Sequence, residues 1–135
     1  MGEPTDRERI ENLRKIGLFA QLSDEALEQV LACATDFDAA AGHVLVETNQ
    51  PGSGLFVIEE GTVTVELPAR KVELGPGEFF GEFALLRDDE RHTARVVTSS
   101  AIKGLAIRRD DFDNLLDKEP TIAIALLKTV AKRVT

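Results

Sequence analysis

The fold is decided by the stretch Leu55–Leu67, which reads LFVIEEGTVTVEL. It holds two short apolar stretches of strand length, and Glu60-Gly61 separates them as a turn does. Outward from it, the same texture extends from about Phe37 to Ile107, with turns that contain Gly and Pro between the apolar stretches. The further stretches are Val44–Val46, Val72–Leu74, Val96–Val97 and Ile102–Ile107. Many short strands punctuated in this way predict an antiparallel barrel or sandwich.

Helical patterns flank this β-rich middle on both sides. Residues 6–17 place apolar side chains at amphipathic spacing within a charged stretch. Ser23 is followed by Asp24 and Glu25, which is a typical helix start, because the hydroxyl can cap and the acids complement the helix N-terminus. After the strands, Arg109 opens another helix and Pro120 starts a last one, which is apolar on more than one side.

The order of helices, strands and helices predicts an α+β fold. Its centre would be an antiparallel β-roll, similar to a jelly roll, flanked by N-terminal and C-terminal helices. We expect a single domain over residues 1–135, with helices at about 6–35, the β-roll at about 37–107 and helices at about 109–134. A chain of this length suits one hydrophobic core.

The composition of the chain excludes several classes of protein. There are 16 Lys and Arg against 24 Asp and Glu, a net charge of −8. No segment has the basic excess that binding to a phosphate backbone needs, so nucleic-acid binding by this chain alone is not expected. No apolar run approaches membrane-spanning length and the charged start is unlike a signal peptide, so we expect a cytoplasmic protein without a membrane partner. Cys33, the single cysteine, excludes an internal disulfide and is expected to be a small buried core residue.

One stretch inside the β-rich middle breaks the strand pattern. Residues 75–86 read GPGEFFGEFALL, with three glycines and a run from Glu82 to Leu86 that suits one helical turn. A short helix that follows a glycine offers unpaired N–H groups and a positive local field. The stretch Glu90–Arg95 then adds positive charge and a hydroxyl. This combination suits a ligand that carries both a phosphate and a sugar diol.

These residues resemble those of a known family. The stretch Phe80–Leu86, followed by Arg91–Val96, resembles the phosphate-binding cassette of cyclic nucleotide-binding domains. Such domains occur in catabolite activator proteins, in regulatory subunits of protein kinase A and in cyclic-nucleotide-gated channels. The resemblance covers nearly the whole chain, because weaker motifs occur in the family's order: Leu18–Ser23, Ala41-Gly42, Asn49–Gly52 and Leu55–Gly61.

The resemblance implies a ligand site built on eight residues. Glu82 would hold the ribose 2′-hydroxyl, and the amides that follow it would hold the cyclic phosphate. An arginine would pair with the phosphate, and a Ser or Thr near it would touch the purine. The implied ligand-binding residues are Gly81, Glu82, Phe83, Ala84, Leu85, Arg91, His92 and Thr93. No metal, and no cofactor besides the nucleotide ligand, is implied.

Two registers compete for the position of the phosphate-binding arginine. Counting forward from Glu82 leads to Arg91, whereas counting back from the run Thr93–Val96 leads to His92. Arg91 is the stronger candidate, because histidine is largely neutral at pH 7. The acids of Asp88–Glu90 would oppose a phosphate unless they point to solvent.

Two functions from different classes fit these observations. The first is a non-enzymatic regulatory module that senses cAMP, with cGMP as the second choice, and signals by moving its C-terminal helices. The second is a degenerate fold of the same family that acts without a ligand, as an interaction or dimerisation module through its C-terminal helix. Its partner would then be a second copy or an effector protein.

Other classes of function fit the sequence poorly. A metal enzyme of the cupin type is disfavoured, because the only histidines are His43 and His92 and they lack a paired-ligand spacing. A transcription factor would need a helix-turn-helix after the last helix. The sequence reaches Thr135 while still in the helical pattern and shows no such motif. We therefore expect the output partner of the module to lie outside this chain.

Overall fold

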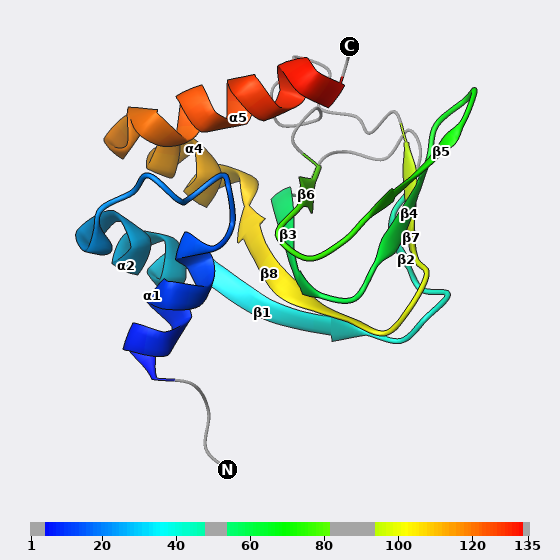
Figure 1. The fold of residues 1–135 in the computed structure, drawn as a ribbon, viewed down its shortest axis with the longest axis horizontal. Coiled ribbons are helices and arrows are strands. Elements are labelled where there is room, and N and C mark those ends of the chain that lie inside the picture. The colour runs from blue at the N-terminus through cyan, green and yellow to red at the C-terminus, as the bar shows by residue number, and fades with distance from the viewer. Residues whose placement is uncertain (1–4, 48–53, 82–93, 134–135) are drawn as a thin grey trace. The chain divides into compact units, whose positions relative to one another are not determined.

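The computed structural model describes residues 5–47, 54–81 and 94–133 (Figure 1). The chain divides into two compact units. One is helical and runs up to Ala34 and again from Asp110 onward, and the other, Thr35–Arg109, contains the strands. Helices, strands and helices follow one another along the chain, so the predicted α+β class is confirmed.

The helices of the described residues are α1 (Asp6–Arg14), α2 (Asp24–Cys33), α4 (Arg109–Lys118) and α5 (Pro120–Arg133). Both N-terminal helices begin at a hydroxyl cap. The Thr5 hydroxyl accepts a hydrogen bond from the Glu8 amide at 3.2 Å, and the Ser23 hydroxyl accepts one from the Ala26 amide at 3.2 Å. Each cap satisfies an N–H that has no partner inside its helix. The predicted helix starts at Ser23 and at Pro120 are confirmed.

The first helix is shorter than the sequence pattern predicts, because it ends at Arg14 instead of continuing to residue 17. Beyond it the chain forms tight turns, in which the Ile16 amide donates to the Leu13 carbonyl and the Phe19 amide donates to the Ile16 carbonyl, both at 2.9 Å. Gly17 lies inside this stretch, and glycine is a poor helix former. The apolar residues around it are buried by the turns.

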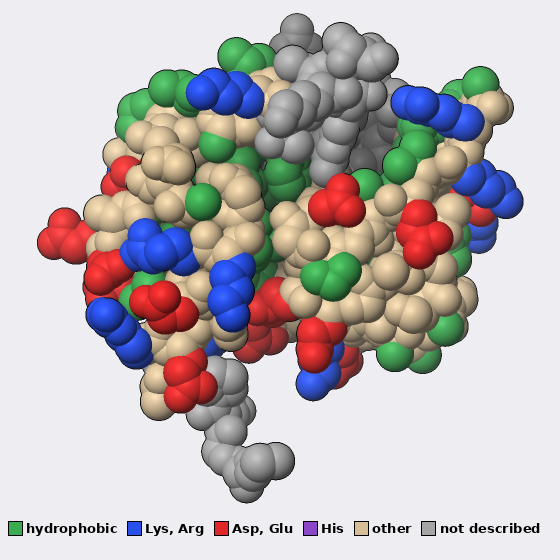
Figure 2. Space-filling view, in the orientation of Figure 1, with side chains coloured by type: hydrophobic (Ala, Val, Ile, Leu, Met, Phe, Trp, Pro, Cys, Tyr) green, Lys and Arg blue, Asp and Glu red, His purple; other side chains and the backbone are tan. Residues whose placement is uncertain are grey.

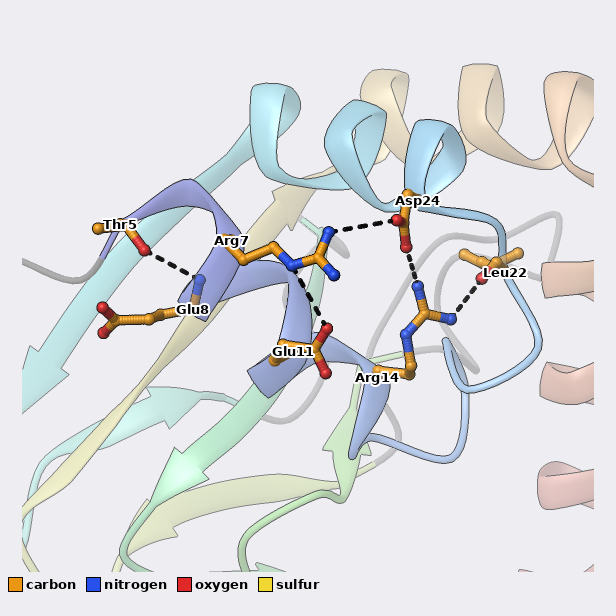
Figure 3. Close-up of polar contacts among 7 residues, drawn as sticks. All are labelled: Thr5, Arg7, Glu8, Glu11, Arg14, Leu22 and Asp24. Carbon is orange, nitrogen blue, oxygen red and sulfur yellow. Dashed lines mark hydrogen bonds and ion pairs between the residues drawn. The ribbon is translucent and has the colours of Figure 1, made fainter.

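An arginine joins the ends of the two N-terminal helices (Figure 3). Arg14, in the last turn of α1, donates at 2.9 Å to the carbonyl of Leu22 and pairs with the carboxylate of Asp24 at the start of α2. Arg7 reaches the same carboxylate at 3.7 Å and also pairs with Glu11 at 3.9 Å. Asp24 therefore receives two guanidinium groups, which link α1 to the start of α2.

The C-terminal end of α2 carries the single cysteine. Cys33 is only half-buried, so the prediction of a buried core position is wrong in degree. Its thiol donates to the Val30 carbonyl at 3.4 Å, and it is the last residue of its helix, where part of the side chain meets solvent. Burial raises the pKa of the Cys33 thiol, and the nearby charge of Asp111 raises it further.

The β unit consists of two four-stranded sheets (Figure 1). Sheet I has the order β1-β8-β3-β6 and sheet II has the order β2-β7-β4-β5. The strands are β1 (Ala34–Ala39), β2 (Val44–Val46), β3 (Gly54–Glu60), β4 (Val63–Glu66), β5 (Lys71–Leu74), β6 (Phe79–Phe80), β7 (Arg95–Thr98) and β8 (Ile102–Arg108). In sheet I, β3 pairs antiparallel with β6 and β8. In sheet II, β4 pairs antiparallel with β5 and β7, and β2 pairs antiparallel with β7.

Each of the six apolar stretches found in the sequence forms a strand, and two further strands lack that signal. β1 reads ATDFDA, in which Phe37 is the only large apolar side chain, and it lies at the edge of sheet I. β6 is two residues long and lies within the glycine-rich stretch 75–86. An edge strand with few buried positions and a two-residue strand leave too little pattern to detect.

The core of the β unit lies between the two sheets. It contains Ile58 and Phe80 from sheet I and Val63 and Val96 from sheet II, among other buried residues. Partly buried apolar side chains pack against it: Phe37, Ala39, Leu45, Phe56, Val65 and Val72. More and less buried residues alternate along β5 and β7, as in a pleated strand with one face toward the core, whereas most positions of β3 are buried.

The surface of the described residues carries charges of both signs. Figure 2 shows acidic and basic side chains mixed over the visible face, without a broad basic area. None of the helices in the described ranges combines the length and the apolar character that crossing a membrane requires. His43 is exposed just before β2.

Candidate ligand-binding site

Of the eight residues predicted to bind a ligand, the structure describes one. Gly81 directly follows β6, whereas Glu82, Phe83, Ala84, Leu85, Arg91, His92 and Thr93 lie outside the described residues, as does the expected helical turn. The motif Asn49–Gly52 also lies outside them. The structure therefore describes the framework of this segment, which we define as the residues that flank 82–93, in and around β6 and β7, together with the strands that pair with them.

At the start of that segment, only glycine fits at position 81. The backbone of Gly81 has a φ of 98°, which side chains other than hydrogen rarely allow. A Cβ atom added there would lie 2.5 Å from the carbonyl oxygen of Gly54 on β3. The preceding residue, Phe80, is in register with Phe56 of the same strand. The chain thus enters residue 82 from a point fixed tightly against β3.

The glycine-rich turn before β6 is also held by hydrogen bonds. The amide of Gly77, whose φ is 86°, donates to the Ile58 carbonyl at 2.8 Å. The Ile58 amide donates in return to the Glu78 carbonyl at 2.9 Å. The Glu78 carboxylate accepts from the Gly75 amide at 2.9 Å. The stretch that the sequence singles out for its glycines is therefore a turn locked onto β3.

At the other end, β7 begins with Arg95, one residue after the segment returns to the described chain. Its guanidinium donates to Glu66 at 3.1 Å and lies 3.4 Å from Glu47. The hydrogen bond to Glu66 raises the pKa of Arg95, with the charge of Glu47 acting in the same direction. From the sequence, Arg95 is only a source of positive charge. The only hint of its ion pair in the sequence is the opposite charge of Glu66, which lies in another predicted strand.

The far end of β7 is held by a buried hydroxyl. Thr98 is 2% exposed, and its hydroxyl accepts from the His43 amide at 2.8 Å and donates to the Ala40 carbonyl at 2.6 Å. The backbones pair as well, because Gly42 donates to the Thr98 carbonyl at 2.8 Å. These bonds attach the turn between β1 and β2 to β7.

Between the sheets, the interior next to Gly81 is aromatic and apolar. The ring of Phe56 stacks on that of Phe80 with centroids 5.0 Å apart and planes at 10°. Phe37 meets Phe56 edge-on at 5.5 Å. Within the described ranges, no group of His, Cys, Asp and Glu is placed to hold a metal ion. The framework therefore offers an apolar wall beside the start of the segment 82–93.

The profile of the cyclic nucleotide-binding domain family matches residues 37–119. The chain therefore belongs to the cyclic nucleotide-binding domain family, and the resemblance found in its sequence is confirmed. Domains of this family are regulatory parts of proteins such as the catabolite activator protein. The match includes both ends of the framework, Gly81 and Arg95.

Individual relatives agree with this assignment. A cyclic nucleotide-gated potassium channel of Rhizobium etli is 36% identical over 118 residues, which are 87% of this chain and 33% of the channel. The cAMP-bound structure of PfPKA-R superposes with a TM-score of 0.83 at 18% identity, covering 94% of this chain and 44% of that one. The catabolite activator protein of Thermus thermophilus gives a TM-score of 0.77 at 27% identity, covering 87% and 58%. The chain thus spans about a third of the length of the channel that it matches.

Proposed function

We propose that this domain is a regulatory sensor that binds a cyclic nucleotide, with cAMP ahead of cGMP, between the sheets of its β-roll. The observation that carries the proposal is the position of Gly81. Gly81 leaves β6 in a conformation that only glycine adopts easily, beside the apolar interior, and the family's cassette motif follows at once. The cAMP in the PfPKA-R structure supports cAMP as the first choice of ligand.

The family motif suggests a role for each of the eight proposed ligand-binding residues. Glu82 accepts a hydrogen bond from the ribose 2′-hydroxyl, and the amides of Gly81 and of Phe83, Ala84 and Leu85 receive the cyclic phosphate. Arg91 pairs with the phosphate, because a guanidinium stays charged and can donate two parallel hydrogen bonds to it. His92 is the alternative in that position, and Thr93 contacts the purine.

The output of the sensor is proposed to pass through the last helix. A ligand can shift an equilibrium between two helix positions only if it binds one of them more tightly. α5 buries Ile122 and Leu126 but leaves Ile124 56% and Leu127 69% exposed. A helix with apolar side chains on both faces can exchange one set of contacts for another, which suits such a switch.

Titration calorimetry of the purified chain with cAMP and cGMP tests this function. We expect one saturable site, tighter for cAMP, and a strong loss of affinity in Glu82→Ala and Arg91→Ala, since each leaves a partner group of the ligand unsatisfied. Lys103→Ala is the matched control, because this exposed residue of β8 pairs only weakly with Glu60 at 3.9 Å. If His92→Ala alone abolishes binding, the register at Arg91 is wrong.

A second candidate function rests on the exposed apolar residues of α5. A domain of this family that no longer binds nucleotide would use Ile124 and Leu127 to hold a second copy or an effector protein. Light scattering distinguishes the two functions. A stable dimer whose mass does not respond to cAMP or cGMP, in a protein that binds neither, favours the ligand-independent module.

A further inference from the structure

A row of alternating charges lies at one end of sheet II, on β7, β4 and β5 and on the residue that directly follows β2. The charge row consists of Glu47, Arg95, Glu66 and Lys71, in the spatial order of the strands β2, β7, β4 and β5. Arg95 is in register with Glu66, and Glu66 is in register with Lys71. The N–O distances are 3.4 Å from Arg95 to Glu47, 3.1 Å from Arg95 to Glu66 and 4.0 Å from Lys71 to Glu66. Single exposed ion pairs contribute little, but networks of several charges contribute more.

The charge row fixes which face of β7 points outward. Val96, next to Arg95, is 3% exposed and belongs to the core, and Val65 and Val72, next to Glu66 and Lys71, also pack against the core. The charges therefore lie on the outer face of sheet II. A shift of β7 by one residue would turn Arg95 toward the apolar core and Val96 toward solvent, because side chains alternate along a strand. The pairing of Arg95 therefore opposes any such shift.

The two ends of β7 are thus held independently, by Arg95 at its start and by Thr98 at its end. Glu47 is the last described residue before the segment 48–53, and Arg95 is the second after the segment 82–93. The ion pair of Arg95 with Glu47 therefore links the residue just before the segment 48–53 to the start of the strand that follows the segment 82–93. A segment whose flanking residues are held in place presents its groups from fixed starting points, which a precise binding site requires.

We propose that Arg95 is a positioning residue for nucleotide binding, which acts through Glu47 and Glu66 and does not contact the ligand. This inference rests on the proposed function of the domain. The ion pairs of Arg95 hold the start of β7 in register. In this proposal they thereby position the preceding residues Arg91, His92 and Thr93 relative to Gly81. Loss of this pairing lowers affinity, because a shift of the start of β7 moves the residues that precede it away from the geometry that the ligand needs.

The test measures cAMP affinity and thermal unfolding together in Arg95→Met, Arg95→Lys and Glu47→Gln. We expect Arg95→Met to weaken binding about three- to tenfold at a temperature where it stays fully folded, a range typical of coupling between neighbouring groups. Arg95→Lys restores part of the affinity. Glu47→Gln keeps the pair with Glu66 and weakens binding less, so the test survives if Arg95→Met does not fold. Lys103→Met, which removes the exposed pair with Glu60 in sheet I, is the matched control and should change nothing.

A charge exchange separates positioning from direct contact with the ligand. The variant Glu47→Gln, Glu66→Arg, Lys71→Gln, Arg95→Glu reverses the central pair without setting like charges opposite each other, and it should recover most of the affinity lost in Arg95→Met. If Arg95 touched the phosphate, a glutamate there would repel it and no recovery would occur, which would overturn the inference. Wild-type affinity in Arg95→Met would also overturn it, while the proposed function would stand. If the wild-type chain binds no cyclic nucleotide at all, the proposed function fails, and this inference fails with it.

Discussion

Gly81 shows how much a single backbone position determines in this domain. Its φ is 98°, and a Cβ atom at this position would lie only 2.5 Å from the carbonyl oxygen of Gly54. The glycine in the family motif is therefore required by the framework itself. Its role does not depend on which ligand the segment 82–93 binds.

Gly81→Ala is therefore expected to destabilise the protein strongly. The positive φ and the clash with the Gly54 carbonyl together should cost about 3 kcal/mol, which urea unfolding would measure. Gly42→Ala is the control for φ alone, because Gly42 has a φ of 83° but nothing within 4 Å of its Cβ position. Equal losses in the two variants would show that the close approach to Gly54 is unimportant.

Cys33 provides a second prediction at the residue scale, about reactivity. Burial, with a contribution from Asp111, raises the pKa of its thiol, so less thiolate is present and alkylation should be slower in the native than in the urea-unfolded protein. Because the pKa in the folded state is raised, the contribution of the neutral thiol to stability is present below the ordinary thiol pKa. It is lost as the pH rises toward the raised value. In Cys33→Ser this alkaline loss should shrink, and an unchanged pH profile would contradict the assignment.

At the scale of elements, α5 carries two neighbouring leucines in opposite environments. Leu126 is 2% exposed and Leu127 is 69% exposed. Leu126→Ala should cost about 2–5 kcal/mol as a core truncation, whereas Leu127→Ala should stay within about 0.5 kcal/mol. Urea unfolding of the two variants at low protein concentration checks this. Similar losses would mean that Leu127 is covered by something in solution.

The sequence predicted most elements of the fold because their signals are local. Ser23 and Pro120 mark helix starts, and each apolar stretch between Val44 and Ile107 forms a strand. The apolar pattern of the sequence failed to predict those elements whose presence or length depends on tertiary contacts. β1 has few apolar residues, β6 is two residues long, and α1 ends at Arg14 although the apolar pattern extends beyond it. For the site, the motif indicated Gly81 but could not indicate that Glu47, Arg95 and Glu66 meet, because their strands pair only in the folded sheet.

At the scale of the whole molecule, the net charge of −8 opposes an anionic ligand. Attraction must therefore come from groups close to the phosphate, against the long-range field of the protein. We expect the association rate of a fluorescent cyclic nucleotide to rise as salt increases from low ionic strength to about 0.15 M, because salt screens the distant acids first. Stopped-flow fluorescence would measure it. A rate that falls steeply with salt would instead indicate a basic entrance to the site.

In the proposed site, backbone amides at and after Gly81 receive the cyclic phosphate. An NMR titration of the isotope-labelled chain with cAMP tests this most directly, because it follows each backbone amide separately. We expect saturable shift changes that are largest for Gly81 to Leu85, and we expect these changes to be lost in Glu82→Ala. An unchanged spectrum with millimolar cAMP or cGMP, or changes confined to the helices, would contradict it.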